Sequence, residues 1–381
     1  MATRASERVR SVLQGVLARD TDVGFCVVGA GHGGMAMAGH LALTGHRVKL
    51  YNRTDEHLNG VRWHGGIKVR GRVEGFGRIE TATSDIAAAL DGSDVVMVVV
   101  PSTAHRNLAR LMAPHLRDGQ VVVLNPGRTG GALEFRSVLA DSGTPACPVI
   151  AEAQTFVYAS RAVSRSEAFI YAIKNRVPLA ALPSHLTPDV LGVLGRAFPQ
   201  FVAGTNVLCT SLDNIGAVFH PALTLLNAGW IEATQGDFDY YSQGITPSVA
   251  RLLEQVDRER IAVARSLGVA TVSAREWLYL TYDSPGRDIY EAIQNTHSYR
   301  GIRAPATIAH RYIFEDVPSS LVPLASLGAM LGARAPTIEF VIRLAEVMHG
   351  RDYWSEGRTV ERLGLAGLTV EGIRRIVDGT D

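Results

Sequence analysis

The sequence predicts an α/β domain with a doubly wound parallel sheet, followed by an all-α domain. Three observations support this prediction. The chain has 381 residues, 46% of them apolar, and a chain of this length usually divides its apolar residues between two cores. In the first half, short apolar runs alternate with helical patterns, which is typical of parallel strands covered by helices on both faces. From about residue 206 the pattern becomes helical.

Five apolar runs predict the strands, and the segments between them predict crossover helices. Strands are expected at residues 25–28, 48–51, 95–100, 121–124 and 149–151, and helices at 34–44, 86–90 and 106–116. Two further β-like pieces, at 169–173 and 178–182, are broken by polar residues. We expect both pieces to extend the same sheet, and their orientation stays open.

The second half predicts helices with recognisable end signals. Thr246 and Pro247 are an N-cap and a first-turn proline for a long helix over residues 248–267, which Gly268 would end. Further helices are expected at 319–331, at 337–349 and at 370–377.

These patterns divide the chain into an extension at 1–21, the α/β domain at 22–205 and the helical domain at 206–381. The extension carries charges throughout and lacks the apolar run of a signal peptide, so we interpret it as a short polar segment. Because no flexible linker is evident, we expect the two domains to meet at a cleft that holds the active site.

The composition excludes several classes of function. Lys and Arg number 38 against 37 Asp and Glu, and no basic stripe is present, so we expect no nucleic-acid partner. No apolar stretch reaches the length of a membrane span. Cys26, Cys147 and Cys209 lack metal-ligand spacing, and the 12 histidines form no zinc motif, so we expect no metal and reduced thiols in the cytoplasm.

A glycine-rich turn follows the first predicted strand. Gly29, Gly31 and Gly34 form G-x-G-x-x-G, with His32 and Gly33 between them, directly before a predicted helix. In a Rossmann domain the first glycine permits the tight turn, the second lets the backbone approach the pyrophosphate, and the third allows close packing. We therefore predict dinucleotide binding at these five residues.

The end of the second strand bears on the choice between the two nicotinamide cofactors. NAD enzymes usually place a carboxylate there, whereas this chain has Asn52 and Arg53. Asn52 can donate a hydrogen bond to a 2′-phosphate and the guanidinium of Arg53 can pair with it, so we predict that both residues bind the cofactor and that NADPH is the first choice. If Arg53 points to solvent instead, NADH would bind as well. Pro101 and Asn125 end later strands on the same edge of the sheet, and we expect both to line the cofactor crevice.

The second half contains an imidazole, a carboxylate and a guanidinium in two segments. His220 lies in an apolar run, and Arg311 and Asp316 lie five positions apart. Residues of these types are often a satisfied core histidine and a solvated helix face. They are also the components of a hydride-transfer site for a keto acid.

The sequence around these residues resembles the bacterial opine dehydrogenases of the octopine/nopaline type. The resemblance covers nearly the whole chain from Phe25 onward. Its most specific segments are residues 125–135 (NPGRTGGALEF), 220–227 (HPALTLLN), 241–248 (YSQGITPS), 299–302 (YRGI), 311–318 (RYIFEDVP) and 356–365 (EGRTVERLGL). The resemblance implies a Rossmann domain with a helical domain like the C-terminal domain of 6-phosphogluconate dehydrogenase. It also implies reductive condensation of an amino acid or amine with a 2-keto acid, commonly pyruvate, through an imine.

The resemblance also assigns roles to individual residues. His220 matches the family's catalytic histidine, Asp316 the carboxylate paired with it, and Arg311 the arginine near the keto acid. Such a pair would transfer protons, and the arginine would orient the keto acid. Glu152 lies where family members place an acidic residue near the amino-acid substrate, and a purely structural role for it is an equal alternative.

Two other functions remain open from the sequence. A 2-keto or hydroxy acid dehydrogenase would reduce a keto group without an amine, although many such enzymes use a lysine of the helical domain, and Lys49, Lys68 and Lys174 all precede it. A non-catalytic NADP-binding protein would keep the fold alone. Asn52-Arg53 is a departure from the member that the chain most resembles, which has an acidic residue there. A homodimer is the preferred assembly.

Overall fold

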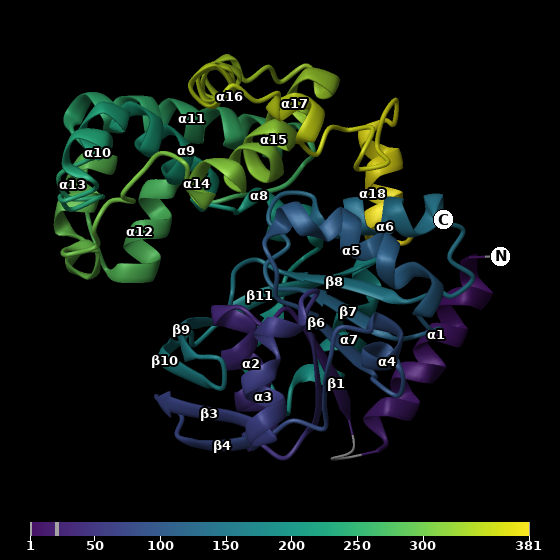
Figure 1. Ribbon diagram of the computed structural model, residues 1–381. Coiled ribbons are helices and arrows are strands. Elements are labelled where there is room, and N and C mark those ends of the chain that lie inside the picture. The colour runs from purple at the N-terminus through teal and green to yellow at the C-terminus, as the bar shows by residue number, and fades with distance from the viewer. Residues whose placement is uncertain (1, 20–22, 381) are drawn as a thin grey trace. The chain divides into compact units, whose positions relative to one another are not determined.

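The computed structural model in Figure 1 describes residues 2–19 and 23–380. The chain forms two compact units. Unit 1 comprises Met1–Thr210 and Glu371–Asp381, and unit 2 comprises Ser211–Val370. No helix among the described residues is long and apolar enough to cross a membrane.

An eight-stranded sheet forms the centre of unit 1, in the order β12-β11-β8-β7-β6-β1-β2-β5. All neighbouring pairs are parallel except β8 and β11. The strands are β1 (Gly24–Val28), β2 (Arg47–Tyr51), β5 (Thr81–Thr83), β6 (Val95–Val98), β7 (Val121–Leu124), β8 (Val149–Ala153), β11 (Val177–Leu182) and β12 (Phe201–Ala203). Every residue of β1, β6, β7 and β8 is buried, as expected for strands covered on both faces. The predicted doubly wound sheet is therefore confirmed.

Helices connect these strands, and three of them, at residues 32–43, 86–90 and 105–112, lie where the sequence predicts helices. They are α2 (His32–Leu43), α3 (Asn59–His64), α4 (Ile86–Leu90), α5 (His105–Met112), α6 (Gly131–Asp141), α7 (Thr187–Leu194) and α8 (Val207–Leu212). Chain order reverses on the two sides of β1, which pairs with β2 on one side and with β6 on the other. Such a reversal places ligands at the carboxyl ends of these strands.

A second, four-stranded sheet corrects one prediction. The piece at 169–173 is part of β10 (Glu167–Ile173), which joins β4 (Gly75–Arg78), β3 (Gly66–Gly71) and β9 (Tyr158–Ser164) in the order β4-β3-β10-β9 instead of extending the main sheet. In β10 the alternate residues Ala168 and Ile170 are buried, which suits a sheet with one covered face. The sheet packs against α2 (Figure 1). The piece at 178–182 does join the main sheet, as the antiparallel strand β11.

The N-terminal segment is also more structured than its composition indicates. The helix α1 (Ala2–Leu17) buries Val9, Leu13 and Val16 against the core of unit 1 and packs on α7. The Nε of Arg10 lies 3.2 Å from a carboxylate oxygen of Asp189. The segment expected at 1–21 thus contains a helix that is charged on its other faces and docks through three apolar residues at helical spacing.

Unit 2 is helical, as predicted. Its helices are α9 (Gly216–Leu226), α10 (Ala228–Thr234), α11 (Pro247–Ser266), α12 (Ala274–Tyr282), α13 (Ile289–Asn295), α14 (Arg311–Phe314), α15 (Val322–Leu331), α16 (Pro336–His349) and α17 (Tyr353–Glu356). The Thr246 side chain accepts a hydrogen bond from the Val249 N–H, so the predicted N-cap of α11 is present. A π-helical segment, Val317–Leu321, precedes α15.

The last helix, α18 (Val370–Asp378), belongs almost entirely to unit 1. A carboxylate oxygen of Asp378 accepts hydrogen bonds from the Asn206 amide at 2.9 Å and from the Ser184 hydroxyl at 3.3 Å. The predicted limits, 22–205 and 206–381, place this helix in the helical domain, whereas the division into compact units places it almost entirely in unit 1.

Candidate cofactor and catalytic sites

The three glycines of the turn after β1 have three different surroundings. Gly29 has φ +112°, and a Cβ there would lie 2.5 Å from the Val99 carbonyl oxygen. A Cβ on Gly34 would lie 1.6 Å from the Gly29 carbonyl oxygen, so this position admits no side chain. Gly31 has no atom within 4 Å of its Cβ position. The open space over Gly31, at the start of α2, is where a Rossmann turn receives a pyrophosphate.

His32 and Gly33 tie this turn to the second sheet. The Nδ1 atom of His32 accepts a hydrogen bond of 3.0 Å from the Ala162 N–H on β9. A Cβ on Gly33 would lie 2.8 Å from the ring of Phe156. The start of α2 is therefore held from two sides.

Asn52 organises the end of β2. Its Oδ1 accepts a hydrogen bond from the Ala30 N–H at 3.1 Å, and its Nδ2 donates to the carbonyl and hydroxyl oxygens of Thr54 at 3.0 and 3.1 Å. Both donors of the amide are thus committed to the turn. Arg53 is exposed, and among the contacts of the described residues its side chain makes no hydrogen bond to the backbone of the turn.

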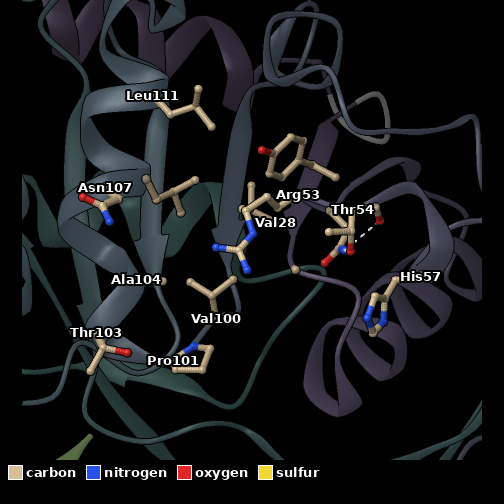
Figure 2. Close-up of a pocket in the computed structure, with 14 residues that line it drawn as sticks. Val28, Arg53, Thr54, His57, Val100, Pro101, Thr103, Ala104, Asn107 and Leu111 are labelled. Carbon is tan, nitrogen blue, oxygen red and sulfur yellow. Dashed lines mark hydrogen bonds between the residues drawn. The ribbon is translucent and has the colours of Figure 1, made fainter. Parts of the chain in front are cut away.

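A pocket of about 530 Å³, named here the β2–α5 pocket, lies beside this turn. Its lining includes Gly29, Arg53 and His57 on one side and Pro101 with α5 residues on the other. Figure 2 shows the Arg53 guanidinium extending into the pocket beside Val100. No carboxylate belongs to this lining among the described residues. A pocket with a cation and apolar walls suits a phosphorylated nucleoside.

Two other predicted residues lie at the carboxyl edge of the sheet. Pro101 lines the β2–α5 pocket, whereas Asn125 does not. Asn125 is buried directly after β7, and its Nδ2 donates to the Val123 carbonyl at 2.9 Å.

Glu152 is fully buried. One carboxylate oxygen accepts a hydrogen bond from the Ala132 N–H in the first turn of α6 at 2.8 Å, and the other accepts one from the Thr210 hydroxyl at 2.7 Å. A carboxylate at a helix N-terminus is stabilised by the helix dipole. These contacts favour the structural alternative for Glu152.

In unit 2, α9 and the segment after α14 bring His220 and Asp316 together. The Nδ1 atom of His220 lies 2.8 Å from Oδ2 of Asp316, although the two residues are 96 positions apart. The Asp316 side chain is 1% exposed and that of His220 is 19% exposed. The carboxylate fixes the imidazole orientation and leaves Nε2 as its reactive nitrogen.

Aromatic rings hold the imidazole from one face. The ring of Tyr312 stacks on His220 with centroids 4.2 Å apart, and Tyr240 stacks on Tyr312 at 5.3 Å. The hydroxyls of Tyr240 and Thr224 donate to the His220 carbonyl at 3.1 and 2.7 Å. Burial raises the pKa of Tyr240 well above its usual value, so this hydroxyl stays protonated. Tyr312 and Tyr240 were not predicted from the sequence, although Tyr312 lies next to Arg311.

Arg311 forms an ion pair within its own segment. Its Nε and Nη2 lie 3.0 and 2.5 Å from Oε2 of Glu315, whose side chain is 4% exposed. The Arg311 side chain itself is 58% exposed. Its neighbour His310 has a lowered pKa because of burial and the charges of Arg311 and His220, which outweigh the opposing charge of Asp316. His310 therefore lies within the electrostatic influence of Arg311, His220 and Asp316. Among the described residues, no group of three potential ligands could hold a metal ion.

Comparison with protein families gives two matches. Residues 203–349 match the α-helical domain of NAD/NADP octopine/nopaline dehydrogenases, and residues 24–127 match the N-terminal domain of NAD-dependent glycerol-3-phosphate dehydrogenases. The opine dehydrogenase of Arthrobacter sp. (strain 1C) is 40% identical over 355 residues, which cover 93% of this chain and 98% of that protein.

Solved structures share the fold. An octopine dehydrogenase with NADH and L-arginine has a TM-score of 0.77 at 21% identity, covering 94% of this chain and 98% of the other. A yersinopine dehydrogenase with NADP⁺ bound has a TM-score of 0.68 at 17% identity, with the same coverage. At these identities the similarity establishes the fold, which is a Rossmann-like domain followed by a helical domain.

Proposed function

The chain belongs to the opine dehydrogenase family, and on that premise we propose that it reductively condenses an amino acid or amine with a 2-keto acid, with pyruvate as the first candidate. The pairing of His220 with Asp316 carries the proposal, because it provides an oriented proton-transfer group in the domain that defines the family. In the overall reaction the amine nitrogen attacks the keto carbon, water leaves, and the resulting imine is reduced to a secondary amine.

NADPH is the proposed cofactor, and NADH is the alternative. Gly29, Gly31, His32, Gly33 and Gly34 would hold the pyrophosphate, and Pro101 would line the crevice. The open space over Gly31 and the carboxylate-free pocket around Arg53 support this assignment. When bound, the nicotinamide supplies the hydride that reduces the imine. Asn125, at the edge where β7 ends, is proposed to contact the same cofactor.

His220 is proposed as the acid and base. As a base, its Nε2 would take a proton from the amine nitrogen during condensation. As an acid, it would protonate the oxygen that leaves as water. The Asp316 carboxylate at 2.8 Å would stabilise the imidazolium formed in between. Stacking of Tyr312 would hold the plane of the His220 ring, so that Nε2 keeps one orientation for proton transfer.

Arg311 is proposed to bind the carboxylate of the keto acid. Its contact with Glu315 uses the edge formed by Nε and Nη2, which leaves the edge formed by Nη1 and Nη2 for a substrate carboxylate. Glu315 would fix the direction in which the guanidinium points. Glu152 is left out of the substrate site because its carboxylate is buried beneath α6.

Two finer expectations are part of the proposal. A cytoplasmic location is supported by the three free cysteines, since reduced thiols are typical of that compartment. A homodimer is proposed because two-fold symmetric dimers are the commonest assemblies of soluble proteins.

The test is an assay of NADPH and NADH oxidation with pyruvate, with and without pools of amino acids or simple amines. We expect oxidation that depends on the amine and an N-carboxyethyl product by mass spectrometry. Oxidation with the keto acid alone would contradict the proposal and indicate an alcohol-forming dehydrogenase. Cofactor binding without turnover on any pair would contradict the choice of substrates.

A further inference from the structure

A second pocket lies on the other side of the glycine-rich turn. It has a volume of about 410 Å³ and is named here the α2–β9 pocket. Gly31, His32 and Met35 of the turn and α2 line one side, and Ala162, Ser164 and Arg165 from the end of β9 and the turn that follows it line the other. His57 is the residue that this pocket shares with the β2–α5 pocket among the described linings. The two pockets therefore meet at His57, in the segment that follows β2.

Arg165 reaches the end of β2 from the second sheet. Its Nη1 lies 2.6 Å from Nδ1 of His57, and because a guanidinium has donors alone, Nδ1 of His57 accepts the bond. Gly60 allows this approach, since a Cβ there would lie 2.6 Å from the Cβ of Arg165. The turn between β9 and β10 therefore packs directly against α3.

The charges around the two pockets favour an anion. Arg53 lines one pocket and Arg165 lines the other, and no carboxylate belongs to either lining among the described residues. The nearby carboxylate of Asp55 is engaged by Arg62 at 2.7 Å. Asn52, the other residue predicted to contact the 2′-phosphate, donates both of its amide hydrogens to Thr54.

We propose that the α2–β9 pocket receives the 2′-phosphate of NADPH, and that Arg165 is a specificity-determining residue for that cofactor. The ribose hydroxyls of a dinucleotide lie at the end of the second strand, and the pyrophosphate lies at the start of the first helix. His57 and Arg165 lie beside the first of these positions, which is where a 2′-phosphate projects. The inference rests on the proposed use of NADPH.

The test compares binding of 2′,5′-ADP and 5′-AMP, two fragments that differ by the 2′-phosphate, and of NADPH and NADH. Calorimetry on the full chain is expected to give tighter binding of 2′,5′-ADP than of 5′-AMP. Arg165→Ala should weaken binding of 2′,5′-ADP and NADPH by about tenfold or more, as expected for a lost charge-assisted hydrogen bond, and leave 5′-AMP and NADH within about twofold. Arg165→Glu should weaken binding of the phosphorylated ligands further.

Arg161→Ala is the matched control, because Arg161 is exposed on β9 and lines neither pocket. Alanine at 165 retains the Cβ that packs on Gly60, so the turn should keep its place. Equal losses for NADPH and NADH would overturn the inference and assign Arg165 to the pyrophosphate. A preference for 2′,5′-ADP that survives Arg165→Ala and Arg165→Glu would overturn the inference and leave NADPH use intact. Equal binding of the two fragments by the unmodified protein would overturn both.

Discussion

The glycine-rich turn of unit 1 and the His220 cluster of unit 2 are built in opposite ways. The turn uses six consecutive residues, and the groups proposed to bind the pyrophosphate are backbone N–H groups at the start of α2. The cluster joins side chains from α9 and the segment around α14 that lie 96 positions apart. A site made of backbone is therefore encoded by local sequence, whereas a site made of side chains depends on how helices pack.

The largest expected effect is on the side-chain site. His220→Ala should lower kcat by roughly 10²–10⁴-fold, the usual contribution of a general acid or base, and Asp316→Asn should cause a loss of the same order. Steady-state assays with saturating substrates would measure this. The dissociation constant of NADPH should not change, because unit 1 binds the cofactor. His297→Ala is the control, since His297 is exposed in the same unit, and full activity of His220→Ala would remove the catalytic assignment.

The turn should respond to substitution at two glycines in different ways. Gly34→Ala places a methyl group 1.6 Å from the Gly29 carbonyl oxygen and should lower the free energy of unfolding by about 3 kcal/mol or more. Gly31→Ala meets no atom within 4 Å at φ −80°, so stability should change by less than ~0.5 kcal/mol while cofactor affinity falls. Urea unfolding and cofactor titration would measure both. Equal stability of the two variants would contradict the assigned difference.

A smaller effect is expected at the keto-acid contact. Arg311→Lys should raise KM for the keto acid by about tenfold, because an ammonium group does not reproduce a two-pronged contact with a carboxylate. Arg343→Lys is the matched control, since Arg343 is 74% exposed and also pairs with a glutamate, Glu346. An equal response of KM in both variants would exclude a specific role for Arg311.

The smallest effect concerns the pH dependence of stability. The pKa of His310 is lowered from 6.5, first by burial and then by the charges of Arg311 and His220. As the pH falls, His310 is protonated in the unfolded chain before it is protonated in the folded chain, and this favours unfolding. The contribution of neutral His310 to the free energy of unfolding is therefore present above pH 6.5 and is lost as the pH falls through the lower pKa of the folded state. His310→Asn keeps a side chain that caps α14 and should flatten the decline of Tm below pH 6.5. An unchanged slope would contradict this assignment.

The fold and the site were predictable from the sequence to different extents. Six strands of the main sheet follow from apolar runs, whereas β5 and β12 were not predicted. The limits of α11 follow from Thr246, Pro247 and Gly268, which act within a few residues. The docking of α1 and the formation of the second sheet were not predicted. Both depend on contacts with distant surfaces, since Val9 and Leu13 are buried against the core of unit 1 and the second sheet packs on α2.

The candidate site shows the same division. His220, Arg311 and Asp316 were assigned through a family resemblance, whereas the stacking of Tyr312 and the ion pair of Arg311 with Glu315 required the structure. Arg165 had no signal in the sequence, because it lies more than a hundred positions from His57 and takes part in no motif.

By itself, the sequence determined the fold class, the position of the glycine-rich turn and the absence of a carboxylate at the end of β2. These properties depend on the conformations and chemistry of neighbouring residues. The tertiary structure decided which side chain faces His220, which face of α2 the second sheet covers, and that Arg165 stands beside His57. These depend on long-range packing, where burial of apolar surface selects among many partners that the local sequence allows equally.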